Sequence, residues 1–221
     1  MSQTVQKIKK LNIEDQMVET VPYTDLMVDF ETLGTTLFPV VGSLGAVLFN
    51  SSTVYNTQTL GYLPACQLFL PFDEQLAKGS LIEQDTFDWW VEQGTMQGAL
   101  IPKTGQHRTL YVFEALDNLE NFISAFNSGQ ANKLRIWCKG LDFDMAILKN
   151  LYRIAGRKIT FFKYNAGMDV RSVIRQFGGD AGNMMFGAVA ISGTPHNPVY
   201  DCMVQIVQCQ TARLKYNMMP F

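Results

Sequence analysis

Apolar and polar positions in the first half of the chain follow the alternation that is typical of β-strands. Residues 25–32, 39–49 and 53–63 are rich in apolar, β-branched and aromatic side chains and predict three successive strands. Because the connections between them are too short for helical crossovers, we expect an antiparallel meander. Residues 1–24 are polar and rich in lysine, so we interpret them as a leader or peripheral extension before a single domain, residues 25–221.

The second half of the chain alternates between helically spaced apolar residues and short apolar runs. The predicted helices cover residues 85–93, 116–126, 143–155, 168–177 and a last segment that begins with Asn197 as N-cap and Pro198 as first helical residue. Predicted strands cover residues 134–138 and 158–164, and predicted loops cover residues 94–109 and 178–187. This order of elements predicts an α/β fold with a mixed sheet flanked by helices.

Composition and charge narrow the class of protein. The chain has 221 residues, of which 47% are hydrophobic and 17% charged, as in globular domains. Its net charge of -2 means that a nucleic-acid ligand would require metal ions or a local basic patch. The cysteines at 66, 138, 202 and 209 are not closely paired, so we expect reduced thiols in a cytoplasmic protein. We find no signal peptide and no segment long enough to span a membrane.

The first predicted strand ends in two acidic residues with one residue between them, Asp29 and Glu31. Side chains alternate between the faces of a strand, so the two carboxylates point the same way. Like charges on one face repel each other unless a cation neutralises them, and Mg²⁺ prefers carboxylate oxygens. The pair therefore indicates a metal site, although a strand with a polar outer face would show the same pattern.

Further titratable residues follow the later elements. Asp144 heads a helical stripe that continues through Leu148 and Leu151, and an acid there is costly to bury without a partner. His196 and Asp201 have four residues between them at the start of the last helix, so they can approach one centre from different heights. Each has an ordinary alternative: Asp144 as an acid favoured by the helix dipole, and His196 as a surface or capping residue. For Asp169, we favour helix capping or pairing with an arginine.

Taken together and in this order, these residues resemble the DEDDh exonucleases of the ribonuclease H-like superfamily. The likeness is greatest to a branch that contains bacteriophage DexA-type exonucleases and a mycobacterial exoribonuclease. The shared motifs are Phe30-Glu31-Thr32-Leu33-Gly34, Trp89-Trp90-x-x-Gln93, Trp137-x-x-Gly140-x-x-Phe143-Asp144-x-x-Ile147-Leu148 and Asp169-x-Arg171. The resemblance covers about residues 25 to 213 and implies a ribonuclease H-like mixed sheet, an antiparallel meander followed by parallel strands.

The resemblance also implies a division of roles among the site residues. Asp29, Glu31, Asp144 and Asp201 would hold two Mg²⁺ or Mn²⁺ ions, and His196 would be the general base. The 3'-terminal nucleotide would contact Thr32, Leu33, Gly34, Phe143, Trp89 and Trp90. Because neighbouring helical residues point about 100° apart, we expect at least one of the two tryptophans to belong to the core. Asp142 is an extra acid, and Tyr200 stands where relatives often have an aspartate.

The implied activity is a metal-dependent 3'–5' exonuclease that releases nucleoside 5'-monophosphates from single-stranded or 3'-ended DNA. RNA is the near alternative substrate, because the residue that would recognise a 2'-hydroxyl is not readable from the sequence. Two other classes stay open. A nuclease-like binding or regulatory module has no need of the full set of acids and histidine, and a ribonuclease H-like endonuclease does not explain His196 at its spacing.

Overall fold

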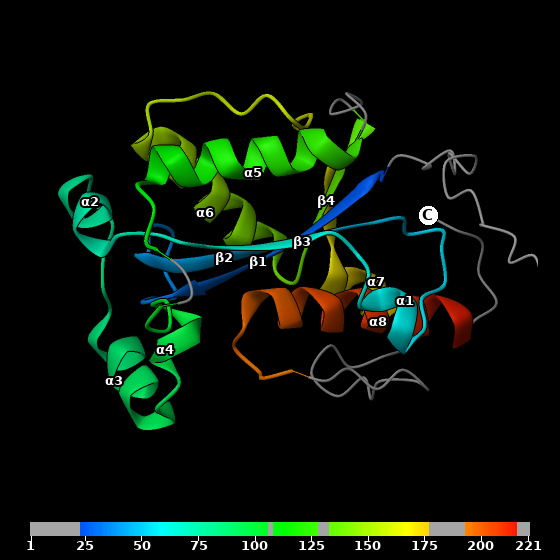
Figure 1. The fold of residues 1–221 in the computed structure, drawn as a ribbon, viewed down its shortest axis with the longest axis horizontal. Coiled ribbons are helices and arrows are strands. Elements are labelled where there is room, and N and C mark those ends of the chain that lie inside the picture. The colour runs from blue at the N-terminus through cyan, green and yellow to red at the C-terminus, as the bar shows by residue number, and fades with distance from the viewer. Residues whose placement is uncertain (1–22, 106–107, 128–132, 177–192, 216–221) are drawn as a thin grey trace, which may run out of the picture.

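The computed structural model describes residues 23–105, 108–127, 133–176 and 193–215. Within them, five strands form one sheet in the order β3-β2-β1-β4-β5 (Figure 1). The strands are β1 (Asp25–Thr32), β2 (Val41–Phe49), β3 (Ala65–Phe69), β4 (Arg135–Cys138) and β5 (Gly167–Asp169). Strands β1, β2 and β3 pair antiparallel, whereas β4 pairs parallel with both β1 and β5. The predicted mixed sheet, an antiparallel meander followed by parallel strands, is confirmed.

Helices cover both faces of this sheet (Figure 1). They are α1 (Thr57–Leu60), α2 (Phe72–Ala77), α3 (Gln84–Gln93), α4 (Met96–Ala99), α5 (Val112–Asn127), α6 (Leu141–Ile154), α7 (Val170–Gln176) and α8 (Pro198–Lys215). Helices α5 and α6 lie on one face, α7 and α8 lie on the other, and α2, α3 and α4 gather at one end. Among these elements, no helix is long and apolar enough to cross a membrane.

Two of the predicted strands are wrong. Residues 53–63 contain the short helix α1, because Asn56 and Thr59 form a reciprocal capping box, and the third strand begins only at Ala65. Residues 158–164 form no strand, because Phe161 is buried in the core next to α5 and α6 instead of entering the sheet. The strand that pairs with β4 is β5, three residues long and beginning at Gly167.

The remaining predicted elements are present with shifted ends. Helix α3 has Glu83 at its N-cap position, and the predicted cap Asp85 lies in its first turn. Gly94 ends α3 in the left-handed conformation that glycine favours. The predicted loop at 94–109 includes the short helix α4. The predicted leader, apart from residues 23 and 24, and the predicted loop at 178–187 lie outside the described residues.

The alternation of β1 divides the interior into two cores. Leu26, Val28 and Phe30 pack with residues of α5 and α6, whereas Met27 packs with Trp137 and residues of α8. Asp29 and Glu31 continue the Met27 series, so both carboxylates lie on the α8 face of the sheet, at the end of β1. The predicted common face is therefore confirmed.

All four cysteines are free thiols.

Candidate metal centre

The start of α8 and the loop before it bring Asp201 and His196 to the face of the sheet that carries Asp29. They can do so because β2 has a glycine at the point where α8 packs against it. Gly45 pairs with Asp29 in the β1–β2 ladder. A Cβ atom on Gly45 would lie 2.3 Å from the backbone carbon of Pro198, so only glycine lets the first turn of α8 rest directly on the strand. Asn197 then caps the helix, as predicted, by accepting a hydrogen bond from the backbone N–H of Tyr200 at 3.0 Å.

His196 and Asp201 meet Glu31 at this point. One possible ligand atom from each residue lies within 4.8 Å of the other two. The backbone N–H of His196 donates to Oδ2 of Asp201 at 3.0 Å, and His196 has a φ of 63°. A positive φ is uncommon for a residue other than glycine, and such strain often accompanies function. The loop before α8 therefore holds the imidazole beside the carboxylates by a defined backbone contact.

Asp144 reaches the same centre from α6. The strand-to-helix connection passes through Gly140, whose φ of 145° is strained for any residue with a side chain, and a Cβ there would also displace the guanidinium of Arg171. This turn leaves Asp144 with 7% of its surface exposed, whereas Asp142 is exposed. Of the two neighbouring acids, Asp144 is the one that points inward, as its place at the head of the apolar stripe predicts.

The four carboxylates influence each other's ionisation. Burial raises the pKa of Asp29 well above its usual range, and the charges of Glu31, Asp144 and Asp201 raise it further. Burial, together with the charge of Asp201, raises the pKa of Glu31 to about 8. Burial raises the pKa of Asp144 to about 7, although Arg171 opposes the shift. Burial also raises the pKa of Asp201.

This donor set fits divalent metal ions. Closely spaced buried carboxylates are unfavourable without a compensating cation, and hard oxygen ligands with one imidazole suit Mg²⁺ or Mn²⁺. Asp29, Glu31, Asp144 and Asp201 come from three separate segments of the chain, yet the shifts in pKa show that their charges are close. Of the predicted metal ligands, Glu31 and Asp201 lie with His196 in one candidate cluster, and Asp29 and Asp144 stay predicted ligands beside it.

Aromatic rings form a wall on the His196 side of the centre. The rings of Trp89 and Trp90 lie edge-on to the imidazole, with centroids 5.1 and 5.6 Å away. Trp90 is buried, with 2% of its surface exposed, and its indole Nε1 donates to the backbone oxygen of Thr32 at 2.9 Å. Trp89 keeps 38% of its surface exposed. The expected division of the pair into one core ring and one accessible ring is confirmed.

A cavity of about 470 Å³ opens beside this wall, and we call it the terminal cavity. Its lining includes Glu31, Thr32, Gly34, Trp89, Trp90, Phe143 and His196. Apart from Glu31 and His196, the residues just named are five of the six that the family resemblance assigns to substrate binding. Leu33, the sixth, does not line the cavity and is buried in a small core with Trp90 and Leu100.

Some structural contacts at the site were not anticipated. Gln205 donates from Nε2 to Oδ1 of Asp29 at 2.8 Å, and its place four residues after Asp201 on a helix was a usable signal. Glu83 accepts hydrogen bonds from the backbone N–H groups of Thr35 and Thr36 and so holds the loop after β1. No local pattern marks that contact, since 48 residues separate Glu83 from Thr35.

Asp169 has the capping role that the sequence favoured. Its Oδ2 accepts from the backbone N–H of Ser172 at 3.0 Å and from the Ser172 hydroxyl at 2.6 Å. These hydrogen bonds lower the pKa of Asp169 below its usual range, against the opposing effect of burial. Asp169 therefore stabilises the start of α7, next to the centre.

Comparison with known families gives a match over most of the chain. The family model described as the 3'-5' exoribonuclease Rv2179c-like domain matches residues 24–212. The chain belongs to this family. As a member of the Rv2179c-like family, it is also similar to a curated exodeoxyribonuclease of Enterobacteria phage T4, with 26% identity over 130 residues. That match covers 58% of this chain and 56% of the phage protein, so it spans little more than half of the relative.

Solved structures show the same fold as this Rv2179c-like domain. E. coli exonuclease I in a zinc-bound complex with single-stranded DNA gives a TM-score of 0.59 at 11% identity, covering 89% of this chain and 41% of that chain. S. pombe Pop2p, in a form with Mg²⁺ and Mn²⁺, gives 0.56 at 10% identity, covering 88% and 84%. The nuclease domain of 3'hExo, described as a DEDDh family member bound to rAMP, gives 0.54 at 12% identity, covering 88% and 93%. The predicted ribonuclease H-like exonuclease fold is confirmed.

Proposed function

We propose that this Rv2179c-like domain is a metal-dependent 3'–5' exonuclease that removes nucleoside 5'-monophosphates from the 3' end of a nucleic acid. The cluster of Glu31, His196 and Asp201 carries the proposal, together with Asp29, whose ionisation is affected by the charges of Glu31, Asp144 and Asp201. The family description and the phage relative support it. A binding module without catalysis would not require this costly group of mutually repelling acids.

The carboxylates of Asp29, Glu31, Asp144 and Asp201 would hold two divalent ions, Mg²⁺ or Mn²⁺. When bound, such ions make water a stronger nucleophile and offset charge on the phosphate and the leaving oxygen. Asp29 and Glu31 are suited to this role because they share one face of a rigid central strand. The presence of metal in structures of similar fold, such as S. pombe Pop2p, supports the assignment.

His196 is the proposed general base. Its backbone is tied to Asp201, and the edge-on rings of Trp89 and Trp90 limit the orientations of the imidazole. Neutral imidazole accepts a proton near physiological pH, and a positioned base of this kind contributes about 10²–10⁴-fold to rate. The proton removed from the attacking water would therefore pass to a ring nitrogen of His196.

The terminal cavity would receive the last nucleotide of the strand. Trp89 presents an accessible ring on which a base can stack, and base stacking is tolerant of sequence. Phe143 lines the cavity near Thr32 and Gly34, which follow the metal-binding strand. A nucleotide held there would place its 5'-phosphate toward Glu31 and His196, which line the same cavity.

We favour single-stranded or 3'-ended DNA as the substrate, and the phage exodeoxyribonuclease supports this choice. RNA is the second candidate, because the family description names an exoribonuclease. The deciding experiment uses 5'-labelled single-stranded DNA, duplex DNA and RNA with Mg²⁺ or Mn²⁺. A ladder of products that shorten by one nucleotide, with release of nucleoside 5'-monophosphates, is expected. Internal cleavage would indicate an endonuclease, and binding without cleavage would indicate a non-catalytic module.

A further inference from the structure

A second cavity, of about 570 Å³, adjoins the metal centre and has no role in the function proposed so far. It lies between β3, the loop that contains α4 and the first turns of α8. Its lining includes Gln67, Thr95, Gln97, Lys103, Asn197 and Tyr200. We call it the inner cavity. Among the residues that the structure describes, the two linings have only His196 in common, so the proposed general base stands between the two spaces.

The two cavities differ in charge. The terminal cavity is lined by the carboxylates of Glu31, Glu83 and Asp85. The described lining of the inner cavity contains no carboxylate, and it carries the amine of Lys103. Phosphate groups are repelled by the acidic centre and attracted by an amine, and the chain as a whole has a net charge of -2. Lys103 is therefore placed where an anionic strand requires a cation.

Side-chain contacts join the walls of the inner cavity. Gln67 donates from Nε2 to the backbone oxygen of Gly98 at 2.9 Å and accepts from Nδ2 of Asn197 at 3.1 Å. Gln67 thereby connects the α4 loop to the residue that follows His196. The stem of Lys103 lies against Gly98, where a Cβ would come within 2.8 Å of Lys103 Cε. The absence of a side chain at Gly98 therefore leaves room for the stem of Lys103 to cross the loop.

The inner cavity also offers surfaces that fit a nucleoside. The hydroxyl oxygen of Thr95 is buried and, among the described residues, has no hydrogen-bond partner. A buried hydroxyl without a partner is costly, and a ligand can satisfy it. Val199 and Met203 supply apolar surface to the same cavity. The space therefore combines a cation, polar groups and apolar surface, as a nucleotide requires.

We propose that the inner cavity binds the nucleotide on the 5' side of the scissile phosphate, with Lys103 contacting a phosphate of the strand. This inference rests on the proposed function, because the terminal cavity already takes the nucleotide on the 3' side. His196 lines both cavities, so a strand that passes from one to the other carries its scissile phosphate past the imidazole. The inner cavity then holds the new 3' end of the shortened strand after each cleavage.

Two substrates of different length test the proposal. In a nucleoside 5'-monophosphate p-nitrophenyl ester, the p-nitrophenyl group replaces the nucleoside on the 5' side and brings no second phosphate, whereas a single-stranded oligonucleotide brings both a nucleotide and further phosphates to the inner cavity. We expect Lys103→Ala to raise KM for the oligonucleotide by about tenfold, because the contact between a charged amine and a phosphate is lost. KM and kcat for the ester should be unchanged. Lys103→Arg, which keeps the charge, should restore most of the oligonucleotide affinity.

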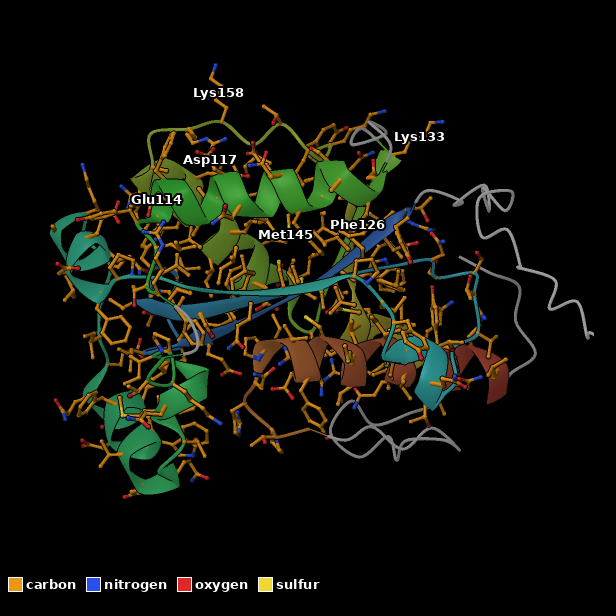
Figure 2. All side chains as sticks on the ribbon, viewed as in Figure 1. Glu114, Asp117, Phe126, Lys133, Met145 and Lys158 are labelled. Carbon is orange, nitrogen blue, oxygen red and sulfur yellow. The ribbon has the colours of Figure 1, made fainter. Side chains whose placement is uncertain are left out.

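Lys158→Ala is the matched control, since Lys158 is an exposed lysine on the opposite side of the molecule from α8 (Figure 2). Lys158→Ala should leave KM and kcat unchanged for both the ester and the oligonucleotide. Oligonucleotide binding, measured by fluorescence anisotropy at several salt concentrations, gives a second readout. Lys103→Ala should reduce the slope of log K against log salt by about 1. A structural role alone would not change that slope.

The possible outcomes distinguish a failure of the inner-cavity proposal from a failure of the exonuclease function on which it rests. Equal effects of Lys103→Ala on ester and oligonucleotide, or no effect on either, would overturn the role of the inner cavity while leaving the exonuclease intact. Hydrolysis of neither substrate by the wild-type protein would overturn the proposed function. Even then, the anisotropy measurement would show whether Lys103 contacts a strand, because binding does not depend on turnover.

Discussion

Gln205 donates a hydrogen bond from its side-chain amide to Oδ1 of Asp29 at 2.8 Å, linking α8 to β1 across 176 residues. Both groups lie inside the α8 face of the sheet, and Gln205 has only 3% of its surface exposed. The contact takes one oxygen of the carboxylate and fixes its orientation, which leaves the second oxygen for a metal ion. Partners of this kind orient metal ligands and tune their affinity.

Gln205→Met should therefore weaken metal binding. Methionine keeps the volume of the side chain but cannot donate to Asp29, and loss of such a partner typically costs about 10–100-fold in metal affinity or activity. We expect the Mg²⁺ concentration for half-maximal activity to rise by about tenfold. Gln208→Met is the control, because Gln208 is equally buried on the same helix. An unchanged Mg²⁺ requirement in Gln205→Met would show that the contact has no positioning role.

The metal-free protein should lose stability as the pH rises. Folding raises the pKa of Glu31 from 4.5 to about 8, so between these values the folded state binds more protons than the unfolded state. The free energy of unfolding therefore falls from about pH 5 to pH 8, and the raised pKa of Asp144 acts in the same direction up to about 7. Thermal unfolding in EDTA should show this decline, and Glu31→Gln should reduce its slope. A melting temperature that rises with pH over this range would contradict the burial of these acids.

Asp144 and Asp142 should differ sharply when each is changed to asparagine. Asp144 is buried at the metal centre, so Asp144→Asn should abolish nuclease activity in Mg²⁺. Asp142 is exposed and lines a different cavity, so Asp142→Asn should keep most of the activity. The two variants are matched controls for each other, because each removes one charge from the first turn of α6. Equal losses of activity would mean that the helix presents both acids to the substrate.

His196→Ala should lower kcat by about 10²–10⁴-fold, the usual contribution of a general base. The Mg²⁺ requirement should change little, because the four carboxylates remain. Activity should recover in part at higher pH, where hydroxide needs no base to remove its proton. Turnover measured at two pH values over a metal titration tests this. A parallel loss of metal affinity would instead make His196 a ligand.

Trp89 and Trp90 should give opposite results when each is replaced by alanine. Trp90 is buried and hydrogen-bonded to Thr32, so Trp90→Ala should destabilise the fold by about 3–5 kcal/mol in chemical denaturation. Trp89 is accessible in the terminal cavity, so Trp89→Ala should raise KM by about tenfold through lost base stacking, with little change in stability. A normal KM in Trp89→Ala would remove the ring from substrate binding.

The sequence by itself determined those features that depend on near neighbours. Strand alternation placed Asp29 and Glu31 on one face, and the 100° step of a helix separated the two tryptophans, because both periods are properties of the local backbone. The cap at Asn197 and the left-handed end at Gly94 likewise rest on hydrogen bonds within a few residues. These patterns, with the family resemblance, were sufficient to predict the mixed sheet and to select the acids of the candidate metal centre.

Tertiary structure alone decided the features that join distant segments. Strand β5 is only three residues long and exists because β4 offers it a partner, so no period could reveal it. The close approach of Pro198 to Gly45 and the hydrogen bond from Gln205 to Asp29 cross more than 150 residues. The inner cavity similarly forms where Lys103 and Asn197 come to line one space. Such contacts depend on how the helices pack against the sheet, and this packing leaves no periodic signal in the sequence.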